Sequence, residues 1–159
     1  MGERQRLLDL VDRSYREQAW HGPSLLETLE GLGAAAAAKR PLKNVHSIWE
    51  LVEHIASWNE IVACRLAGRP MTVTPELNFP PVTQTTPAAW KLTLRRLART
   101  HAHFRDEVAR FPVTRLGRKR PGVEQSWNVL IHGQIQHALY HAGQIAMLRR
   151  AMGKPVAPH

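Results

Sequence analysis

Hydrophobic side chains recur three and four residues apart along four long stretches of this chain. These stretches are residues 3–19, 48–67, 87–111 and 127–152. Such spacing places the apolar side chains on one face of an α-helix. A residue that can cap a helix stands just before three of the stretches, at Ser47, Thr86 and Ser126. The pattern therefore predicts an all-α protein, and four substantial helices favour a four-helix bundle.

The segments between these helices are predicted to be short helical turns or loops. Ser24 can cap a short segment that runs to about Leu32, and Ala34–Ala38 is expected to form a weak turn of helix. Residues 69–86 are rich in Pro and Thr and predict a long irregular crossover, whereas residues 112–122 predict a basic loop. The four long helices therefore carry the expected bundle.

Length and composition bound the class of protein. A chain of 159 residues is long enough for one compact domain, which we expect to span residues 1–159. No run of about 18 apolar residues is present, so no membrane span is predicted. No long apolar stretch follows the N-terminal residues, so we expect no signal peptide and a cytoplasmic location. The single cysteine, Cys64, excludes an internal disulfide and a cysteine-based zinc cluster.

The net charge of +9 is concentrated in the second half of the chain. Residues 86–159 hold thirteen basic and three acidic side chains, whereas residues 1–50 hold seven of each. The basic side chains of the third long helix are spread around its axis, and those from Arg115 to Arg120 form a loop cluster without interleaved aromatic residues. This distribution favours a solvated basic surface over a nucleic-acid site, and it leaves an anionic small-molecule substrate open.

Two histidines four residues apart, His137 and His141, are the main candidates for chemistry. In a helix they lie about 40° apart on one face, one turn above the other. Apolar residues flank them, so the pair lies within the stripe that should face inward. Two interpretations remain at this point. Each imidazole is a core residue bonded to a carbonyl group or to Gln134 or Gln144, or both imidazoles bind one metal ion together with a third ligand.

A third candidate ligand, His54, lies in the second turn of the predicted helix 48–67. It shares a stripe with Trp58 and Ile61 at the margin of the apolar face, where a ligand could lean into the bundle. A hydrogen-bonded histidine at the boundary of the core fits the same position. The remaining histidines are terminal, stand at helix breaks or caps, face away from the pair, or alternate so that one at most faces inward. They are His21, His46, His101, His103, His132 and His159.

Three segments carry a combination of residues that is more specific than any one of them. They are Trp20-His21-Gly22-Pro23-Ser24-Leu25, the run HSIWELVEHIASW from His46 to Trp58, and His132-Gly133 followed by His137-x-x-Tyr140-His141-x-Gly143-Gln144-Ile145. In this order and at these separations they resemble the DinB/YfiT superfamily of bacterial metal-binding four-helix proteins. The resemblance implies an up-down-down-up bundle, which fits the long crossover at residues 69–86.

The resemblance also implies a metal centre. Carried over residue by residue, its ligands are His54, His137 and His141, and the ion is divalent zinc, nickel or iron. Some members carry a further histidine where this chain has Gly133, so a three-ligand site is implied here. Three neutral imidazoles leave the ion its positive charge, which lowers the pKa of a bound water toward neutrality.

Two functions are compatible with such a centre. The first is an enzyme that activates water for hydrolysis, or a low-molecular-weight thiol for transfer, toward a small-molecule substrate. The second is a non-catalytic, metal-stabilised bundle that binds a ligand or serves as a dimerisation module. Because dimers are common among the proteins that the chain resembles, we also expect a homodimer.

Few residues are candidates for the pocket or for proton transfer. Four lie on or near the histidine stripe and could line a pocket, with packing as the alternative role: Trp58, Gln134, Tyr140 and Gln144. Glu53 and Glu60 are predicted on the outer side of their helix, so no general acid or base is assigned.

Overall fold

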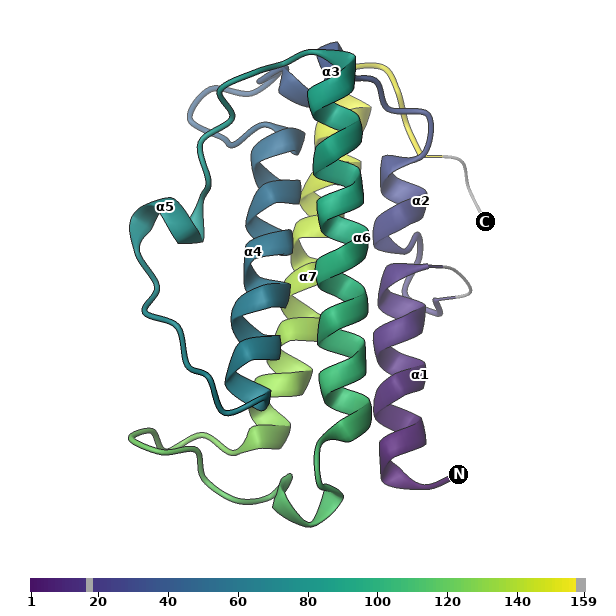
Figure 1. Cartoon of the computed structure of the whole chain (residues 1–159). Coiled ribbons are helices and arrows are strands. Elements are labelled where there is room, and N and C mark those ends of the chain that lie inside the picture. The colour runs from purple at the N-terminus through teal and green to yellow at the C-terminus, as the bar shows by residue number, and fades with distance from the viewer. Residues whose placement is uncertain (17–18, 157–159) are drawn as a thin grey trace.

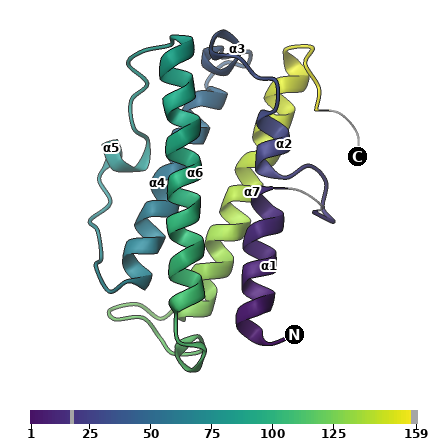
Figure 2. The same ribbon diagram turned by 45° about the vertical axis from the view of Figure 1, so that its right-hand side comes forward.

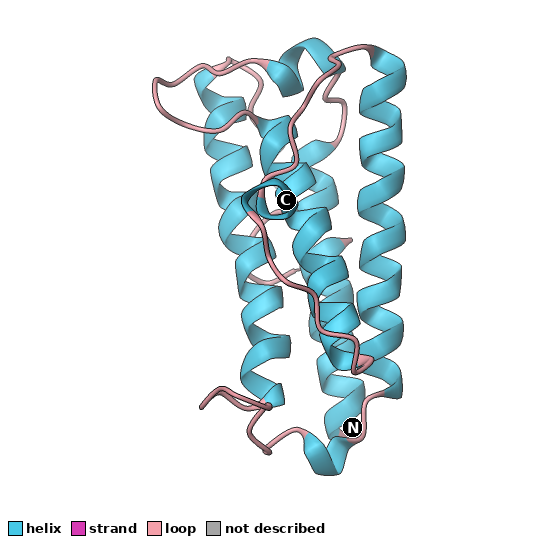
Figure 3. Ribbon diagram, turned by 60° about the vertical axis from the view of Figure 1, so that its left-hand side comes forward, coloured by secondary structure: helices cyan, strands magenta, loops and turns pink. Residues whose placement is uncertain are grey.

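The structure is a computed structural model that describes residues 1–16 and 19–156. Four long helices dominate it: α1 (Glu3–Tyr15), α4 (Ile48–Leu66), α6 (Pro87–Arg110) and α7 (Trp127–Ala151). Shorter elements connect them: α2 (Leu25–Leu29), α3 (Ala34–Ala38), α5 (Pro75–Asn78) and the 3-10 turn η1 (Val113–Arg115). Apart from one isolated bridge between Lys119 and Ser126, the described residues contain no β-structure (Figure 3). The predicted all-α class is confirmed.

The four long helices lie side by side (Figure 1). The chain ascends along α1 in this view, descends along α4 and α6, and ascends again along α7. Helix α4 packs against both α6 and α7, and α1 packs against the same two helices. Figure 2 shows α2 above α1, both alongside α7. The crossover from α4 to α6 climbs the outer side of α4 and carries α5 on the way (Figure 1).

The long helices begin where the sequence predicts them to begin. The hydroxyl of Ser47 accepts a hydrogen bond from the backbone N–H of Glu50 at 3.2 Å, and the Glu50 carboxylate accepts one from the backbone N–H of Ser47 at 2.7 Å. This reciprocal pair is a capping box, which satisfies two N–H groups that the first turn leaves free. Thr86 and Ser126 cap α6 and α7 without a reciprocal bond, by accepting a hydrogen bond from the backbone N–H three residues on.

The first helix is shorter than predicted. Apolar spacing suggested a helix from residue 3 to residue 19, but α1 ends at Tyr15 and Ala19 is not helical. Residues 17 and 18 of the predicted helix, and the terminal His159, lie outside the described residues. The hydroxyl of Ser24 donates a hydrogen bond to the backbone carbonyl of Arg16, so a side chain satisfies one of the carbonyl groups at the end of α1.

The buried apolar side chains form two clusters along the bundle. One contains Ile48, Ile55, Leu97 and Ile145, and the other contains Val11, Val62, Phe104 and Ile131. The apolar spacing predicted along residues 87–111 corresponds to a buried face of α6 that carries Trp90, Leu97, His101, Phe104 and Val108, and Leu94 is half-buried. Burial of each large side chain contributes about 1.5–3 kcal/mol, so these clusters hold the four long helices in register.

One buried arginine joins α7 to the segment that follows α2. The Arg149 side chain is 9 % exposed, and its guanidinium donates to the carbonyl oxygens of Thr28 at 2.9 Å, Glu30 at 2.7 Å and Lys154 at 2.9 Å. It therefore satisfies carbonyl groups that the ends of two helices leave free. No helix within residues 1–16 and 19–156 is long and apolar enough to cross a membrane.

Candidate metal centre

Three histidine side chains converge between the two helices α4 and α7. His54 comes from α4, and His137 and His141 come from successive turns of α7. The Nε2 atom of His137 lies 2.9 Å from Nε2 of His54 and 3.0 Å from Nε2 of His141. One ring nitrogen from each residue lies within 4.8 Å of the others, which is close enough for one metal ion. The three residues predicted as ligands are therefore brought together.

Hydrogen bonds fix the orientation of two of these rings. Nδ1 of His54 lies 2.6 Å from the backbone carbonyl oxygen of Asn78, and Nδ1 of His141 lies 2.7 Å from Oε1 of Gln144. Both oxygens are acceptors, so each Nδ1 carries the proton and donates it. The Nε2 atom of each ring therefore keeps its lone pair, and that lone pair points toward His137. This second layer of acceptors is typical of histidines that bind metals.

Hydrogen bonding alone does not satisfy this cluster. His137 can place one proton on Nε2 and donate it to His54 or to His141, but not to both. In the other Nε2–Nε2 contact, two nitrogens then face each other with no proton between them. Nδ1 of His137 is buried and has no hydrogen-bond partner within the described part of the chain. Three neutral imidazoles that face one point are a suitable donor set for a divalent cation, so these residues fit a metal better than an internally bonded core.

The electrostatics of the site keep the three rings neutral. Burial, together with the positive charge that His141 would carry, lowers the pKa of His54 to about 4. Burial and the two neighbouring histidines lower the pKa of His137 to about 3, and burial lowers the pKa of His141. All three are therefore unprotonated near neutral pH, which is the form that binds a metal without releasing a proton.

The crossover between α4 and α6 covers one side of the centre. Asn78, the last residue of α5, uses its backbone carbonyl for His54 and its side-chain oxygen for the indole N–H of Trp58 at 2.8 Å. The next residue, Phe79, stacks on His54 with ring centroids 4.0 Å apart, and His46 stacks on Phe79 at 4.1 Å. The sequence predicted only an irregular crossover here, and the roles of Asn78, Phe79 and His46 were missed. Thr74-Pro75, a cap followed by proline, was the available signal for α5.

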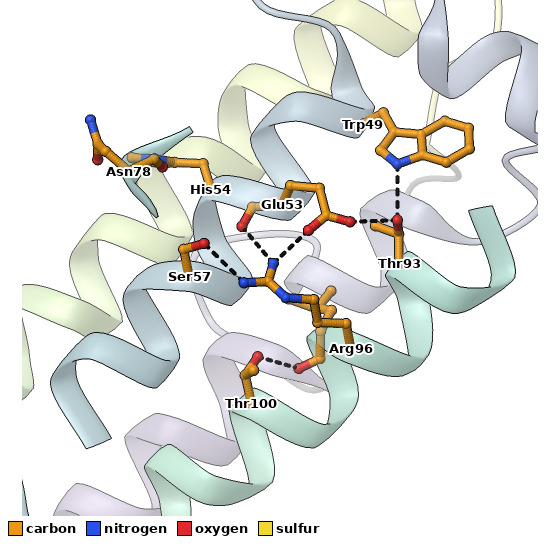
Figure 4. A network of polar contacts seen from close by, with 9 residues as sticks. Trp49, Glu53, His54, Ser57, Asn78, Thr93, Arg96 and Thr100 are labelled. Carbon is orange, nitrogen blue, oxygen red and sulfur yellow. Dashed lines mark hydrogen bonds and ion pairs between the residues drawn. The ribbon is translucent and has the colours of Figure 1, made fainter. Parts of the chain in front are cut away.

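The acidic residues of α4 do not reach the centre. Figure 4 shows Glu53 directed toward Arg96 and Thr93 of α6, on the other side of α4 from His54. Arg96 also donates to the hydroxyl of Ser57 at 3.0 Å. The prediction that Glu53 lies on the outer side of its helix is therefore wrong, because α6 covers that side. Glu60 likewise faces α6, where its carboxylate lies 3.1 Å from Nδ1 of His103.

The four pocket candidates have different surroundings. Trp58 and Gln134 line a cavity of about 430 Å³ that borders His54 and His137. Gln134 is buried and donates to the side-chain oxygen of Asn59 at 2.8 Å, so it also joins α7 to α4. Gln144 does not line the cavity but orients His141. Tyr140 is 67 % exposed and lines a separate hollow on another face of α7.

The Gln144 contact gives a testable expectation for metal affinity. We expect Gln144→Ala to weaken metal binding about 10-fold to 100-fold, because it removes the acceptor that holds the proton on Nδ1 of His141. Gln144→Glu, which keeps an acceptor, should retain the affinity. Competition with a chromophoric chelator measures both variants. The exposed Gln136 lies on the same helix, and Gln136→Ala is the matched control. Equal affinity in Gln144→Ala and in the control would contradict the expectation.

The lowered histidine pKa values predict how stability depends on pH. Burial lowers the pKa of His101 to about 4, as it does for His54, while unfolded histidine titrates near about 6.5. Between about pH 6.5 and about pH 4 the unfolded chain therefore binds more protons than the folded chain. The free energy of unfolding of the metal-free protein should therefore decrease as the pH is lowered through this window, by up to about 1.4 kcal/mol per pH unit for each such group.

Urea unfolding of the metal-free protein at several pH values measures this slope. His101 stacks on Tyr15 with ring centroids 3.7 Å apart, and His101→Phe keeps an aromatic ring in that place. This variant should lower the slope of unfolding free energy against pH by the contribution of nearly one bound proton. A free energy of unfolding that stays constant from about pH 7 to about pH 5 would be incompatible with buried neutral histidines.

The protein is a helical bundle in which three histidines from two helices face a common point. It therefore belongs to the class of α-helical proteins with a candidate metal site. A family model of the DinB superfamily matches residues 17–145, which include all three histidines. The chain belongs to the DinB superfamily. Neither the curated proteins nor the solved structures include a significant match to the chain.

Proposed function

We propose that this chain is a metal-dependent enzyme in which His54, His137 and His141 hold a divalent zinc, nickel or iron ion. The observation that carries the proposal is the arrangement of protons around the cluster. Asn78 and Gln144 accept the Nδ1 protons of two histidines, and this leaves the Nε2 lone pairs directed at a common point. Membership of the DinB superfamily supports the same assignment.

The residues around the centre suit a reaction of a small molecule. A bound divalent ion supplies Lewis acidity, which lowers the pKa of a coordinated water for hydrolysis or of a coordinated thiol for transfer. The histidines bind the ion and stay neutral because they are buried. Trp58 and Phe79 form apolar walls that limit the access of water, and the cavity beside His137 gives a small substrate or a thiol room to approach. The three histidines do not select one metal, so availability decides among the three ions.

A second candidate function is a non-catalytic bundle stabilised by a metal. One observation favours it, namely that no carboxylate is among the described residues lining the cavity at the centre. Glu53, the nearest acidic residue along α4, is bound to Arg96. A bundle of this kind would bind a ligand or form a homodimer, and a homodimer is also compatible with the enzyme.

Metal removal separates the two functions. We expect purified protein to contain one divalent ion per chain by elemental analysis, and metal-loaded protein to turn over at least one member of a panel of low-molecular-weight thiols, esters and amides. A chelator should abolish this turnover, and the same metal should restore it. If the loaded protein turns over nothing while the chelator sharply lowers its melting temperature, the metal is structural and the enzyme proposal is wrong.

A further inference from the structure

Two arginines occupy the wall between the cavity at the centre and a second cavity. Arg65 comes from the last turn of α4, and Arg120 comes from the loop that precedes α7. Both residues line the cavity of about 430 Å³ beside His54, and both line a neighbouring cavity of about 660 Å³. The two cavities are therefore neighbours that share a pair of positively charged side chains.

The positive charges at this junction have no negative partner. Among the described residues, neither Arg65 nor Arg120 forms an ion pair, and no Asp or Glu lines either cavity. Glu124 lies in the same loop as Arg120, but it is paired with Lys119. Nε of Arg120 is buried without a hydrogen-bond partner in the described part of the chain, and its Nη2 donates to Gln125 at 2.7 Å. Burial, together with the charge of Arg120, lowers the pKa of Arg65.

The surroundings connect this pair to the three histidines. The guanidinium carbon of Arg65 lies 5.7 Å from the centroid of the Trp58 ring, and that ring lies 5.6 Å from the ring of His137. Because only the Trp58 ring separates the guanidinium of Arg65 from His137, a single small molecule that lies along Trp58 can reach both groups. The cavity is lined by apolar side chains, including Val62 and Leu130, and by polar ones, including Gln125 and Gln134.

We propose that Arg65 and Arg120 bind the anionic group of a small molecule whose other end reaches the three histidines. The role of that other end rests on the function proposed above. A carboxylate, sulfonate or phosphate group fits this pair, because guanidinium groups present planar arrays of donors that match such oxygens. The anion would also balance two like charges that face a cavity with apolar walls. The substrate is thus an anionic small molecule.

Binding of benzenesulfonate, measured by calorimetry, tests this subsite. Methyl phenyl sulfone has a similar shape but no charge, and we expect it to bind at least about tenfold more weakly. Arg65→Gln and Arg120→Gln should each weaken the binding of benzenesulfonate by about tenfold. Arg118 is exposed, lies in the same loop as Arg120 and lines neither cavity, so Arg118→Gln is a control with the same change of charge. This control should bind benzenesulfonate as the unmodified protein does.

Additional measurements separate this inference from the proposed metal site. Metal content and circular dichroism should be unchanged in Arg65→Gln and Arg120→Gln, so that weaker binding is not a result of misfolding. The substitution His54→Ala should remove the metal and leave benzenesulfonate binding in place. Equal binding of benzenesulfonate and the sulfone, or equal binding by all the arginine variants, would overturn the subsite even if the metal site is correct. A DNA oligonucleotide that binds more tightly than benzenesulfonate and is weakened by the same two variants would also overturn it, because the arginines would then contact a nucleic-acid backbone.

Discussion

Replacing His54 with alanine is expected to lower the affinity for a divalent metal by more than about 100-fold while the protein stays folded. Loss of a residue that merely orients a ligand costs about 10-fold to 100-fold, so loss of a ligand should cost more. His137 and His141 would remain, but two imidazoles do not complete a three-coordinate site. Elemental analysis after dialysis, together with chelator competition, measures the affinity, and circular dichroism of the metal-free variant tests the fold.

The histidine that pairs with Glu60 provides the control. His103 lies on α6 outside the cluster, and His103→Ala should bind metal as the unmodified protein does. Retention of metal by His54→Ala would rule out the three-histidine site. Complete unfolding of His54→Ala would instead indicate that the metal holds the bundle together.

Arg149→Ala is expected to lower the free energy of unfolding by about 3 kcal/mol. The guanidinium of Arg149 donates to the carbonyl oxygens of Thr28, Glu30 and Lys154. Removal of a buried donor leaves its acceptors without partners, and hydrogen bonds to a charged group contribute about 1.5–3 kcal/mol each, although such values do not add. Urea unfolding of the variant and of the unmodified protein gives the difference.

The neighbouring residue allows a matched comparison. Arg150 is exposed and carries the same charge on the same turn of α7, so Arg150→Ala should change the free energy of unfolding by less than about 0.5 kcal/mol. Arg149→Lys keeps the charge but has fewer donors, so its stability should lie between the two alanine variants. A loss in Arg149→Ala no larger than the loss in Arg150→Ala would show that the three contacts contribute little.

Signals that lie close together in the sequence predicted the helices well. Ser47 with Glu50, and Thr86 with Pro87, mark the starts of α4 and α6 because capping depends on residues within one turn. The inward positions of α6 followed from periodicity, since this helix is amphipathic and one face is clearly more apolar. Capping residues and a single apolar face were therefore sufficient to predict where these helices begin and which side of α6 is buried.

The surroundings of α4 could not be predicted in the same way. Periodicity gives the direction of a side chain relative to the axis of its own helix, but not which other helices cover that direction. α4 packs against both α6 and α7, so the side that carries Glu53 is covered even though it is polar. Arg96, which binds Glu53, lies 43 residues further along the chain.

The candidate centre was predictable in part. The spacing of His137 and His141 placed two imidazoles on one face, and the resemblance to a family added His54. Gln144 was a candidate because helical periodicity places it about 20° from the direction of His137. Asn78 was not predictable, because it acts through its backbone carbonyl and every residue type has one. Its role depends on where the crossover lies in space.

The backbone contact from Asn78 has a consequence for the order in which the centre is assembled. The proton on Nδ1 of His54 is held by a segment that follows it by 24 residues, so the ligand set is complete after the crossover has docked on α4. By reciprocal linkage, metal that binds the docked state more tightly must also stabilise the docking. Metal affinity therefore reports how firmly the crossover is docked, and a substitution that undocks it would reduce metal uptake even with all three histidines intact. Backbone amides of residues 74–79 should then exchange with deuterium more slowly once metal is bound.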